Sequence, residues 1–309
     1  PAFYGNWFME RLEQGYACWK RPFSGRPQYV SFAKARAIVF WSKNPAPFFH
    51  HLDTLDRLGM NYYFLFTLND YDAEGLEPCV PPLDERIATF IRLSDRVGKG
   101  RVVWRSDPLL LSDSIPVDAL LGKLARVGDR IHPYTDRLIF SFIDIAKYPK
   151  VQRSLREQGF SGVREFTGEE IILFSEGLAD LNKRWGLTLA TCADRRDLSA
   201  YGIGKGQCIS YDLLMREFSD DRALAAFLAG GGQTAIDGTG SAARIRELKD
   251  PGQRGPCGCI VSKDTGQYNT CPHLCAYCYA NSSVNGVQRN YSRYRESERT
   301  GSYPDTIVG

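Results

Sequence analysis

The stretch YYFLFT at residues 62–67 is a continuous run of mostly aromatic and branched side chains. A short run of this kind is typical of a β-strand that is buried on both faces, as in a parallel sheet. Similar runs occur at residues 37–41 (AIVFW), 101–104 (RVVW), 137–142 (RLIFSF) and 187–191 (LTLAT). We therefore expect these five strands to lie in one parallel sheet.

Helical segments separate the predicted strands. They are expected at residues 47–58, 83–97, 117–127, 149–158, 168–185 and 220–228. Several begin near a proline, such as Pro47, and end near a glycine, such as Gly98. This alternation predicts an α/β fold, and at 309 residues a (β/α) TIM-type barrel or partial barrel is the leading form. An open, doubly wound sheet is the alternative.

The character of the sequence changes after residue 228. We expect residues 1–228 to form the α/β barrel body. Residues 229–309 are expected to form a glycine-rich linker and a cysteine-rich iron–sulfur segment that packs on the barrel mouth. Within that segment, the stretch VQRNYSRYRESERTG at residues 287–301 predicts a polar, mostly solvated tail.

The composition excludes several classes of protein. The 39 basic residues are nearly matched by 36 acidic ones, and the net charge of +3 does not favour a nucleic-acid partner. No apolar run reaches the ~18–20 residues of a membrane span, and residues 1–15 do not resemble a secretion signal. Nine cysteines are an odd number for a disulfide framework. We expect a cytoplasmic protein with reduced thiols and no membrane partner.

Several predicted strands run directly into polar residues. In α/β barrels and open α/β sheets, ligands bind at the carboxyl ends of the strands. We therefore expect a polar ring around a pocket that takes a small polar molecule as substrate. Its candidate catalytic residues are Lys43, Asn44, Arg105, Asp107, Asp144 and Asp194. The alternative for each of them is a helix cap or a turn.

Five of the nine cysteines lie between Cys257 and Cys278. Zinc ribbons and knuckles usually present two CxxC-like pairs. The compact unit here is a CxxxCxxC formed by Cys271, Cys275 and Cys278. Three thiolates so close together can bind three irons of a cubane and leave the fourth iron open. We expect a [4Fe–4S] cluster at these three cysteines.

The stretch CPHLCAYCYAN at residues 271–281 resembles the radical S-adenosylmethionine (SAM) superfamily. Its signature is CxxxCxΦC, where Φ is aromatic, and Tyr277 matches Φ. The local sequence is most similar to that of superfamily members with the motif CPHxCxYCYA, among them enzymes of spore photoproduct repair. The resemblance implies that the open iron binds SAM and that reductive cleavage yields a 5′-deoxyadenosyl radical. It also implies an electron donor such as a ferredoxin or flavodoxin.

Three residues of this stretch are candidates for cofactor binding: Tyr277, His273 and Asn281. His273 could donate a hydrogen bond to a cluster sulfide or to substrate, or it could only shape the loop. In most of the superfamily the motif follows the first strand, whereas here it lies near the C-terminus. A barrel closes by bringing its last segment beside its first, so a C-terminal loop could reach the same mouth.

Two other functions stay open. We find no glycine-rich SAM-binding strand, because Thr167 and Glu170 predict a helix start instead. The chain could then be an iron–sulfur enzyme that uses the open iron as a Lewis acid or electron relay, without SAM. The third hypothesis is a zinc-stabilised binding module.

A closer resemblance covers almost the whole chain. Its motifs are PAFY (1–4), FWSKNP (40–45), VVWRSDP (102–108), SFID (141–144), CGC (257–259) and YNTCPHLCAYCYAN (268–281). Together they are similar to an uncharacterised bacterial and archaeal domain family with radical-SAM-like cysteines at its C-terminus. Members usually carry a further strand-like segment before PAFY, so we expect a first barrel strand upstream of Pro1.

Four other cysteines could form a second metal site. They are Cys192, Cys208, Cys257 and Cys259. Four thiolates are enough to close a second cluster or a tetrahedral zinc site. The alternative for Cys192 or Cys208 alone is a buried apolar thiol. Cys18 and Cys79 are expected to have no metal-binding role.

Overall fold

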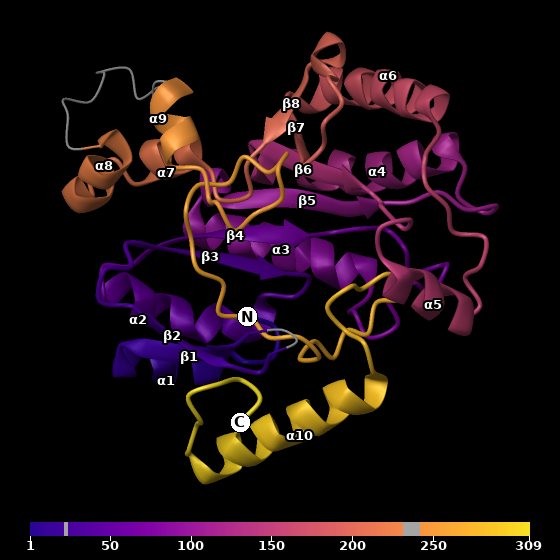
Figure 1. The fold of residues 1–309 in the computed structure, drawn as a ribbon. Helices are drawn as coiled ribbons and strands as arrows, with labels where there is room; N and C mark the ends of the chain where they lie inside the picture. Colours follow the sequence, from indigo (N-terminus) through magenta and orange to yellow (C-terminus); the bar gives the residue numbers. More distant parts are fainter. Residues whose placement is uncertain (22–23, 231–241) are drawn as a thin grey trace.

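The fold is built around a six-stranded parallel sheet (Figure 1). The computed structural model describes residues 1–21, 24–230 and 242–309. The strands are β3 (Ala37–Ser42), β4 (Asn61–Thr67), β5 (Val102–Leu109), β6 (Arg137–Phe142), β7 (Thr188–Cys192) and β8 (Ile203–Gly206). They lie side by side in chain order, and each neighbouring pair is parallel. The predicted α/β class and the five predicted strands are confirmed.

The sheet is open, so the structure does not show the expected TIM-type barrel. Its edges are β3 and β8, which do not pair with each other in the part of the chain that the structure describes. The strand order never reverses, which also distinguishes it from a doubly wound sheet. The sixth strand, β8, has the sequence IGKG and lacks the branched and aromatic residues that would have predicted it.

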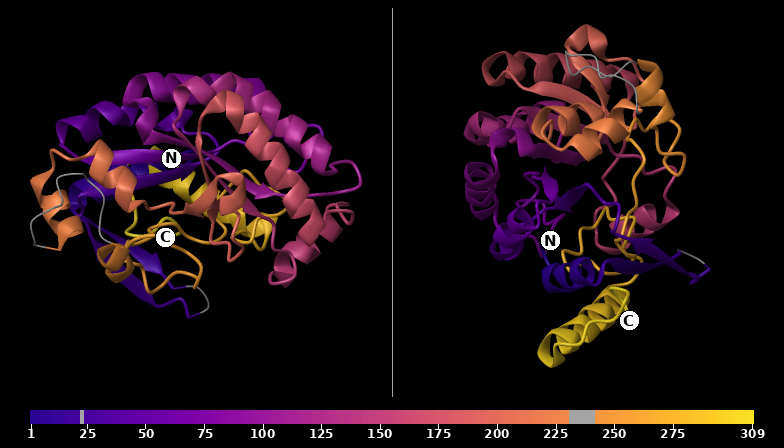
Figure 2. Two further views of the ribbon diagram at one scale, coloured as in Figure 1. Left: turned by 90° about the horizontal axis from the view of Figure 1, so that it is seen from above. Right: turned by 90° about the vertical axis from the view of Figure 1, so that its left-hand side faces the viewer.

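Helices cover one face of the sheet. They are α2 (Leu52–Arg57), α3 (Leu83–Val97), α4 (Val117–Ile131), α5 (Pro149–Glu157) and α6 (Gly168–Trp185), with short 3-10 turns at η1 (Ala46–His51), η2 (Lys99–Arg101), η3 (His132–Tyr134) and η4 (Ser199–Tyr201). Phe64 and Phe66 of β4 share a core with Phe90 of α3 and Phe174 of α6. Figure 2 shows these helices as an arc on one side of the sheet.

The other face of the sheet is covered by the C-terminal third of the chain. Tyr63 and Leu65 point to this side, because side chains alternate along a strand. They share a core with Leu214 of α7 (Tyr211–Glu217), Leu228 of α8 (Arg222–Ala229) and Ile260. In a closed barrel this inner face would line the interior, so these segments lie where a barrel has its packed centre.

The segment after residue 228 packs against both faces. Cys275 and Tyr277 belong to the core formed with α3 and α6, and Cys259 belongs to the other core. Helix α9 (Ala242–Glu247) lies in this segment, before the cysteines. Residues 231–241 of the expected glycine-rich linker lie outside the described residues. The domain boundary at residue 228 stays a prediction.

The two ends of the described chain pack together. Helix α1 (Gly5–Gln14) and the antiparallel hairpin of β1 (Tyr16–Lys20) and β2 (Pro27–Ser31) lie beside α10 (Val284–Thr300). The Trp7 indole donates a hydrogen bond to the Pro304 carbonyl at 2.8 Å, and Arg11 pairs with Asp305 at 2.8 Å. The stretch 287–301 is mostly exposed, as expected, and it forms most of α10, in which Tyr294 is buried.

None of the helices within residues 1–21, 24–230 and 242–309 combines the length and the apolar character that crossing a membrane requires.

Two glycines of α4 provide a test of the packing between α4 and α6. A Cβ at Gly128 would overlap the Trp185 indole, whereas a Cβ at Gly122 would meet nothing within 4 Å. The indole is held by a hydrogen bond to Asp129 at 2.7 Å. We expect Gly128→Ala to lower the free energy of unfolding by about 1–3 kcal/mol through overpacking. Gly122→Ala should raise it by up to about 1 kcal/mol, because alanine favours helix.

Urea denaturation followed by circular dichroism measures both changes. Equal effects of the two alanines would show that Trp185 does not pack against Gly128 as described.

Candidate functional site

A buried polar network lies at the carboxyl ends of β3, β4, β5 and β6. Lys43 follows β3, Asn69 follows β4, Asp107 lies in β5 and Ser141 lies in β6. Parallel strands bring these ends to the same edge of the sheet, which is where α/β proteins bind ligands. The network therefore occupies the predicted position.

Glu77 is the centre of the network, and its side chain is 0% exposed. Its Oε1 accepts hydrogen bonds from Lys43 Nζ at 2.8 Å, from Asn69 Nδ2 at 2.9 Å and from the Tyr277 hydroxyl. Arg86, whose side chain is 1% exposed, approaches Oε2 at 3.5 Å. A carboxylate with this many donors is stabilised in its charged form although it is buried.

Glu77 and Lys43 each stabilise the charged form of the other side chain. Burial alone would raise the pKa of Glu77, but the Lys43 ammonium and its hydrogen bond hold that pKa below the ordinary 4.5. Burial alone would lower the pKa of Lys43, but the charge of Glu77 and then that of Cys275 raise it above 10.5. Both groups are therefore charged at neutral pH.

The network continues through Asp107 to Arg105. The Asn69 side chain donates to the Asp107 carbonyl at 3.1 Å, and its Oδ1 accepts from the Asp107 N–H at 3.0 Å. The Asp107 carboxylate binds Arg105 Nη2 at 2.8 Å and the Ser141 hydroxyl. Burial lowers the pKa of Arg105, and the charges of Asp107, Cys208 and Cys192 more than offset it, so the guanidinium stays charged.

One end of the network touches the three-cysteine loop. Cys271, Cys275 and Cys278 are all free thiols. Burial raises the pKa of Cys271 to about 11 and also raises that of Cys275, whereas the nearby Lys43 ammonium lowers both. The three cysteines lie within eight residues of the chain, and the Cys278 N–H donates a hydrogen bond to the Cys275 carbonyl at 3.0 Å.

The loop is anchored to the segment around residues 76–79. The Ala276 N–H donates to the Leu76 carbonyl at 2.9 Å, and His273 Nδ1 donates to the Cys79 carbonyl at 2.9 Å. Leu274 adopts a left-handed backbone conformation with φ of 54°, which makes the turn between Cys271 and Cys275 tight.

Two polar atoms of this loop are buried and have no hydrogen-bond partner. They are His273 Nε2 and Asn281 Oδ1. Burial lowers the pKa of His273 to about 4, so the ring is neutral near pH 7. Because Nδ1 donates to Cys79, Nε2 carries a lone pair that nothing satisfies. A buried polar atom of this kind is normally satisfied by a bound water, ion or other partner.

Arg105, at the other end of the network, interacts electrostatically with two cysteines of the second group, Cys208 and Cys192. The Sγ atoms of Cys192 and Cys208 are 3.5 Å apart. Cys257 and Cys259 lie in the same apolar core as Cys208. The polar network thus runs from one cysteine group to the other along the carboxyl edge of the sheet.

Three of the predicted catalytic residues lie outside the network. Asn44 accepts a hydrogen bond from the Ala46 N–H at 3.2 Å and so caps the turn η1. Asp144 pairs with Lys147, and Asp194 accepts the Arg196 N–H at 2.9 Å in a tight turn. These three residues make the local caps and turns of the alternative interpretation, and a role for them in a pocket stays a prediction.

Tyr277 joins the three-cysteine loop to the network, and its predicted role in cofactor binding stays a prediction. Its hydroxyl bonds to Glu77, to Lys43 at 3.0 Å and to Asn69 at 3.1 Å, so it holds the loop against the network. Sequence reasoning missed Glu77 and Arg86, because both contribute from a loop and a helix rather than from a strand end. Asn69 carried the same signal as Lys43, since it too comes directly after a strand.

The thiolates fit an iron–sulfur cluster by their chemistry, because soft sulfur ligands are those that such clusters take. As the side chains stand, no group of three or more His, Cys, Asp or Glu in the described ranges is arranged to hold a metal ion. Binding at either cysteine group would therefore require side-chain rotation.

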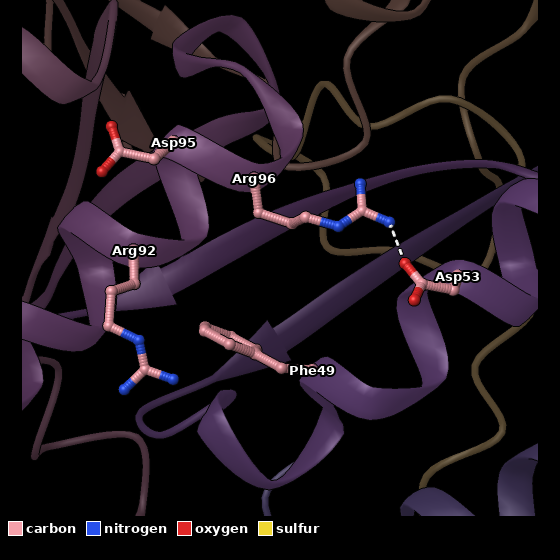
Figure 3. A pocket seen from close by; sticks show the side chains of 5 residues that line it. All are labelled: Phe49, Asp53, Arg92, Asp95 and Arg96. Atoms are coloured by element: carbon pink, nitrogen blue, oxygen red, sulfur yellow. Dashed lines mark hydrogen bonds and ion pairs between the residues drawn. The ribbon is translucent and has the colours of Figure 1, made fainter.

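A surface hollow lies elsewhere, on the outer helices (Figure 3). It has a volume of about 450 Å³ and is lined by Phe49, Asp53, Arg92, Asp95 and Arg96. Asp53 and Arg96 form an ion pair at 2.6 Å across it. None of the cysteines or network residues contributes to this hollow.

Comparison with known proteins identifies one family. No curated protein matches the chain, and no solved structure matches it. A family model described as a domain of unknown function, DUF1848, matches residues 1–280, which include the sheet, the polar network and both cysteine groups. The chain therefore belongs to the DUF1848 family.

Proposed function

We propose that this protein is an iron–sulfur enzyme of the radical-SAM type, with a [4Fe–4S] cluster bound by Cys271, Cys275 and Cys278. The observation that carries the proposal is the position of these three free thiols beside a buried charged network at the carboxyl edge of a parallel sheet. The motif CxxxCxΦC supports it, and so does the strand order, which suits a partial barrel.

The residues around the loop suit such a cluster. Lys43 supplies a positive charge next to Cys275, which offsets the negative charge of thiolate ligands. His273 Nε2 and Asn281 Oδ1 are buried acceptors without partners at the same place. Tyr277 and Glu77 position the loop through their hydrogen bond.

The chain's own residues would bind and orient the reactants. When bound, a cluster of this type supplies the electron that cleaves SAM, and a ferredoxin or flavodoxin delivers that electron. Arg105 and Asp107 offer a charged pair at 2.8 Å that can hold a small polar substrate by hydrogen bonds. Burial of the network keeps water away from the reacting groups.

One observation favours the SAM-independent alternative. Thr167 and Glu170 form a capping box at the start of α6, with Glu170 N–H to Thr167 Oγ1 at 3.2 Å, so this segment is no glycine-rich SAM-binding strand. In that case the open iron would act as a Lewis acid or an electron relay.

The test is anaerobic purification and reconstitution, followed by iron and sulfide analysis and electron paramagnetic resonance with and without SAM. We expect at least about four irons per chain and a reduced spectrum that SAM changes. A spectrum that SAM leaves unchanged, with no 5′-deoxyadenosine formed, would favour the SAM-independent enzyme. Zinc at these three cysteines in place of iron would contradict both and favour a zinc-stabilised binding module.

A further inference from the structure

Four cysteines converge behind the carboxyl ends of β7 and β8. Cys192 ends β7, Cys208 follows β8, and Cys257 and Cys259 come from the C-terminal segment. The Sγ atoms of Cys192 and Cys208 are 3.5 Å apart. Cys208, Cys257 and Cys259 are buried in the same apolar core. All four are free thiols, so three separate segments of the chain bring reduced sulfur to one place.

The backbone is shaped to bring them together. Cys192 and Gly206 are register partners in the β7–β8 pair. A Cβ at Gly206 would lie 2.8 Å from the Thr191 carbonyl oxygen, so only glycine allows β8 to approach β7 this closely. The Ile260 N–H donates to the Ile209 carbonyl at 3.1 Å and fixes the Cys257–Cys259 loop beside Cys208.

A backbone N–H and a guanidinium lie beside these sulfurs. The Ile209 N–H donates to Cys259 Sγ at 3.3 Å, which is a hydrogen bond to sulfur of the kind that orients metal ligands. Cys208, Cys257 and Cys259 are 5–6% exposed. The Arg105 guanidinium lies close enough to interact electrostatically with Cys192 and Cys208, and its Nε is buried without a partner. Arg105, which also pairs with Asp107, thus brings a positive charge near the four sulfurs.

We propose that Cys192, Cys208, Cys257 and Cys259 bind a single zinc ion in a tetrahedral site. Zn–S bonds of about 2.3 Å in a tetrahedron place the sulfurs about 3.8 Å apart, close to the 3.5 Å between Cys192 and Cys208. A cubane would hold each thiolate on a different iron and spread the sulfurs further. Zinc binding would release the protons of the four thiols. The cysteine side chains would rotate so that their sulfurs surround the ion.

This zinc would have a structural role. It would tie the end of β7, the turn after β8 and the C-terminal segment into one unit that covers the inner face of the sheet. A site with four protein ligands has no open position for substrate, which is typical of structural zinc. The proposal is independent of the cluster at the other three cysteines, because the two sites share no ligand.

The test compares variants of the full chain that are expressed with zinc, purified without oxygen and analysed for metals by mass spectrometry. We expect about one zinc per chain in the wild type, and its loss in the double variant Cys257→Ser/Cys259→Ser. The triple variant of Cys271, Cys275 and Cys278 to serine should keep the zinc. The matched control is Cys79→Ser, because Cys79 is an exposed free thiol and should be without effect on zinc.

A second measurement on the wild type covers the case in which the double variant fails to fold. Zinc X-ray absorption should report four sulfur ligands at about 2.3 Å. Loss of iron rather than zinc from the double variant would show a second cluster and overturn the proposal. A Cys192–Cys208 disulfide found by peptide mapping, or zinc ligands other than sulfur, would overturn it as well.

Discussion

Cys275→Ser is expected to remove iron from the three-cysteine loop almost completely. The reconstituted wild type should hold about four irons at this site, and the variant should hold close to none. A serine hydroxyl is a poor substitute for thiolate, and Cys275 is the most buried of the three cysteines, so water cannot replace it. Formation of 5′-deoxyadenosine from SAM should fall to the background of a protein-free reaction.

The control for this prediction is Cys79→Ser. Cys79 lies beside the loop, where its carbonyl accepts from His273, but its side chain is exposed and free. The control should therefore keep both iron and activity. A Cys275→Ser protein that still binds about four irons would contradict the assignment of the cluster to this loop.

Glu77→Gln is expected to lower the free energy of unfolding by about 3–5 kcal/mol, because removing one charge of a buried pair leaves the other uncompensated. Lys43 and Arg86 both approach the Glu77 carboxylate, and Lys43 has no other carboxylate partner among the contacts of the described residues. Arg86 keeps a second partner in Asp72. The measurement is equilibrium urea denaturation of the metal-free proteins.

A surface pair with the same chemistry is the control for Glu77→Gln. Glu296 and Arg299 form an exposed ion pair on α10 at 2.6 Å. Glu296→Gln should change the free energy of unfolding by no more than about 1 kcal/mol. Equal effects at Glu77 and Glu296 would show that the buried network contributes no special stability.

The effect of Glu77→Gln on the free energy of unfolding should depend on pH. The pKa of Glu77 in the folded protein lies below its ordinary 4.5, so its contribution is complete above that value and is lost as the pH falls through the folded pKa. The pKa of Lys43 is raised above 10.5, so its contribution is complete below that value. The stability difference between wild type and Glu77→Gln should be largest near neutral pH and shrink in acid.

Much of the sheet could be predicted from the sequence. The strands that are apolar throughout, such as YYFLFT, were located to within a residue or two, because burial on both faces leaves a strong pattern. Helices α3 and α6 were predicted with their observed bounds. The strand β8 could not be found, because its IGKG sequence is determined by close backbone approach rather than by side-chain burial.

The candidate site was predictable in part. Lys43, Arg105 and Asp107, which follow or end predicted strands, lie in the network, whereas Asp144 and Asp194 make local turn contacts. A catalytic role for all five stays a prediction. Glu77 could not be predicted, since an acidic residue in a loop reads as solvated until the loop 271–281 covers it. Likewise the convergence of Cys192 with Cys257 depends on a fold in which the C-terminal segment crosses the inner face of the sheet.

Because the C-terminal segment covers the inner face of the sheet, that face is exposed while the chain is being synthesised. Strands β3 to β7 leave the ribosome before the segments that cover Tyr63, Leu65 and Val103 exist. At roughly 5–20 residues per second, this apolar face stays bare for a period on the order of seconds, until residue 260 emerges. The newly made chain should depend on holding chaperones during that interval. Because the last cysteines emerge after the sheet, metal loading would be the step that completes folding.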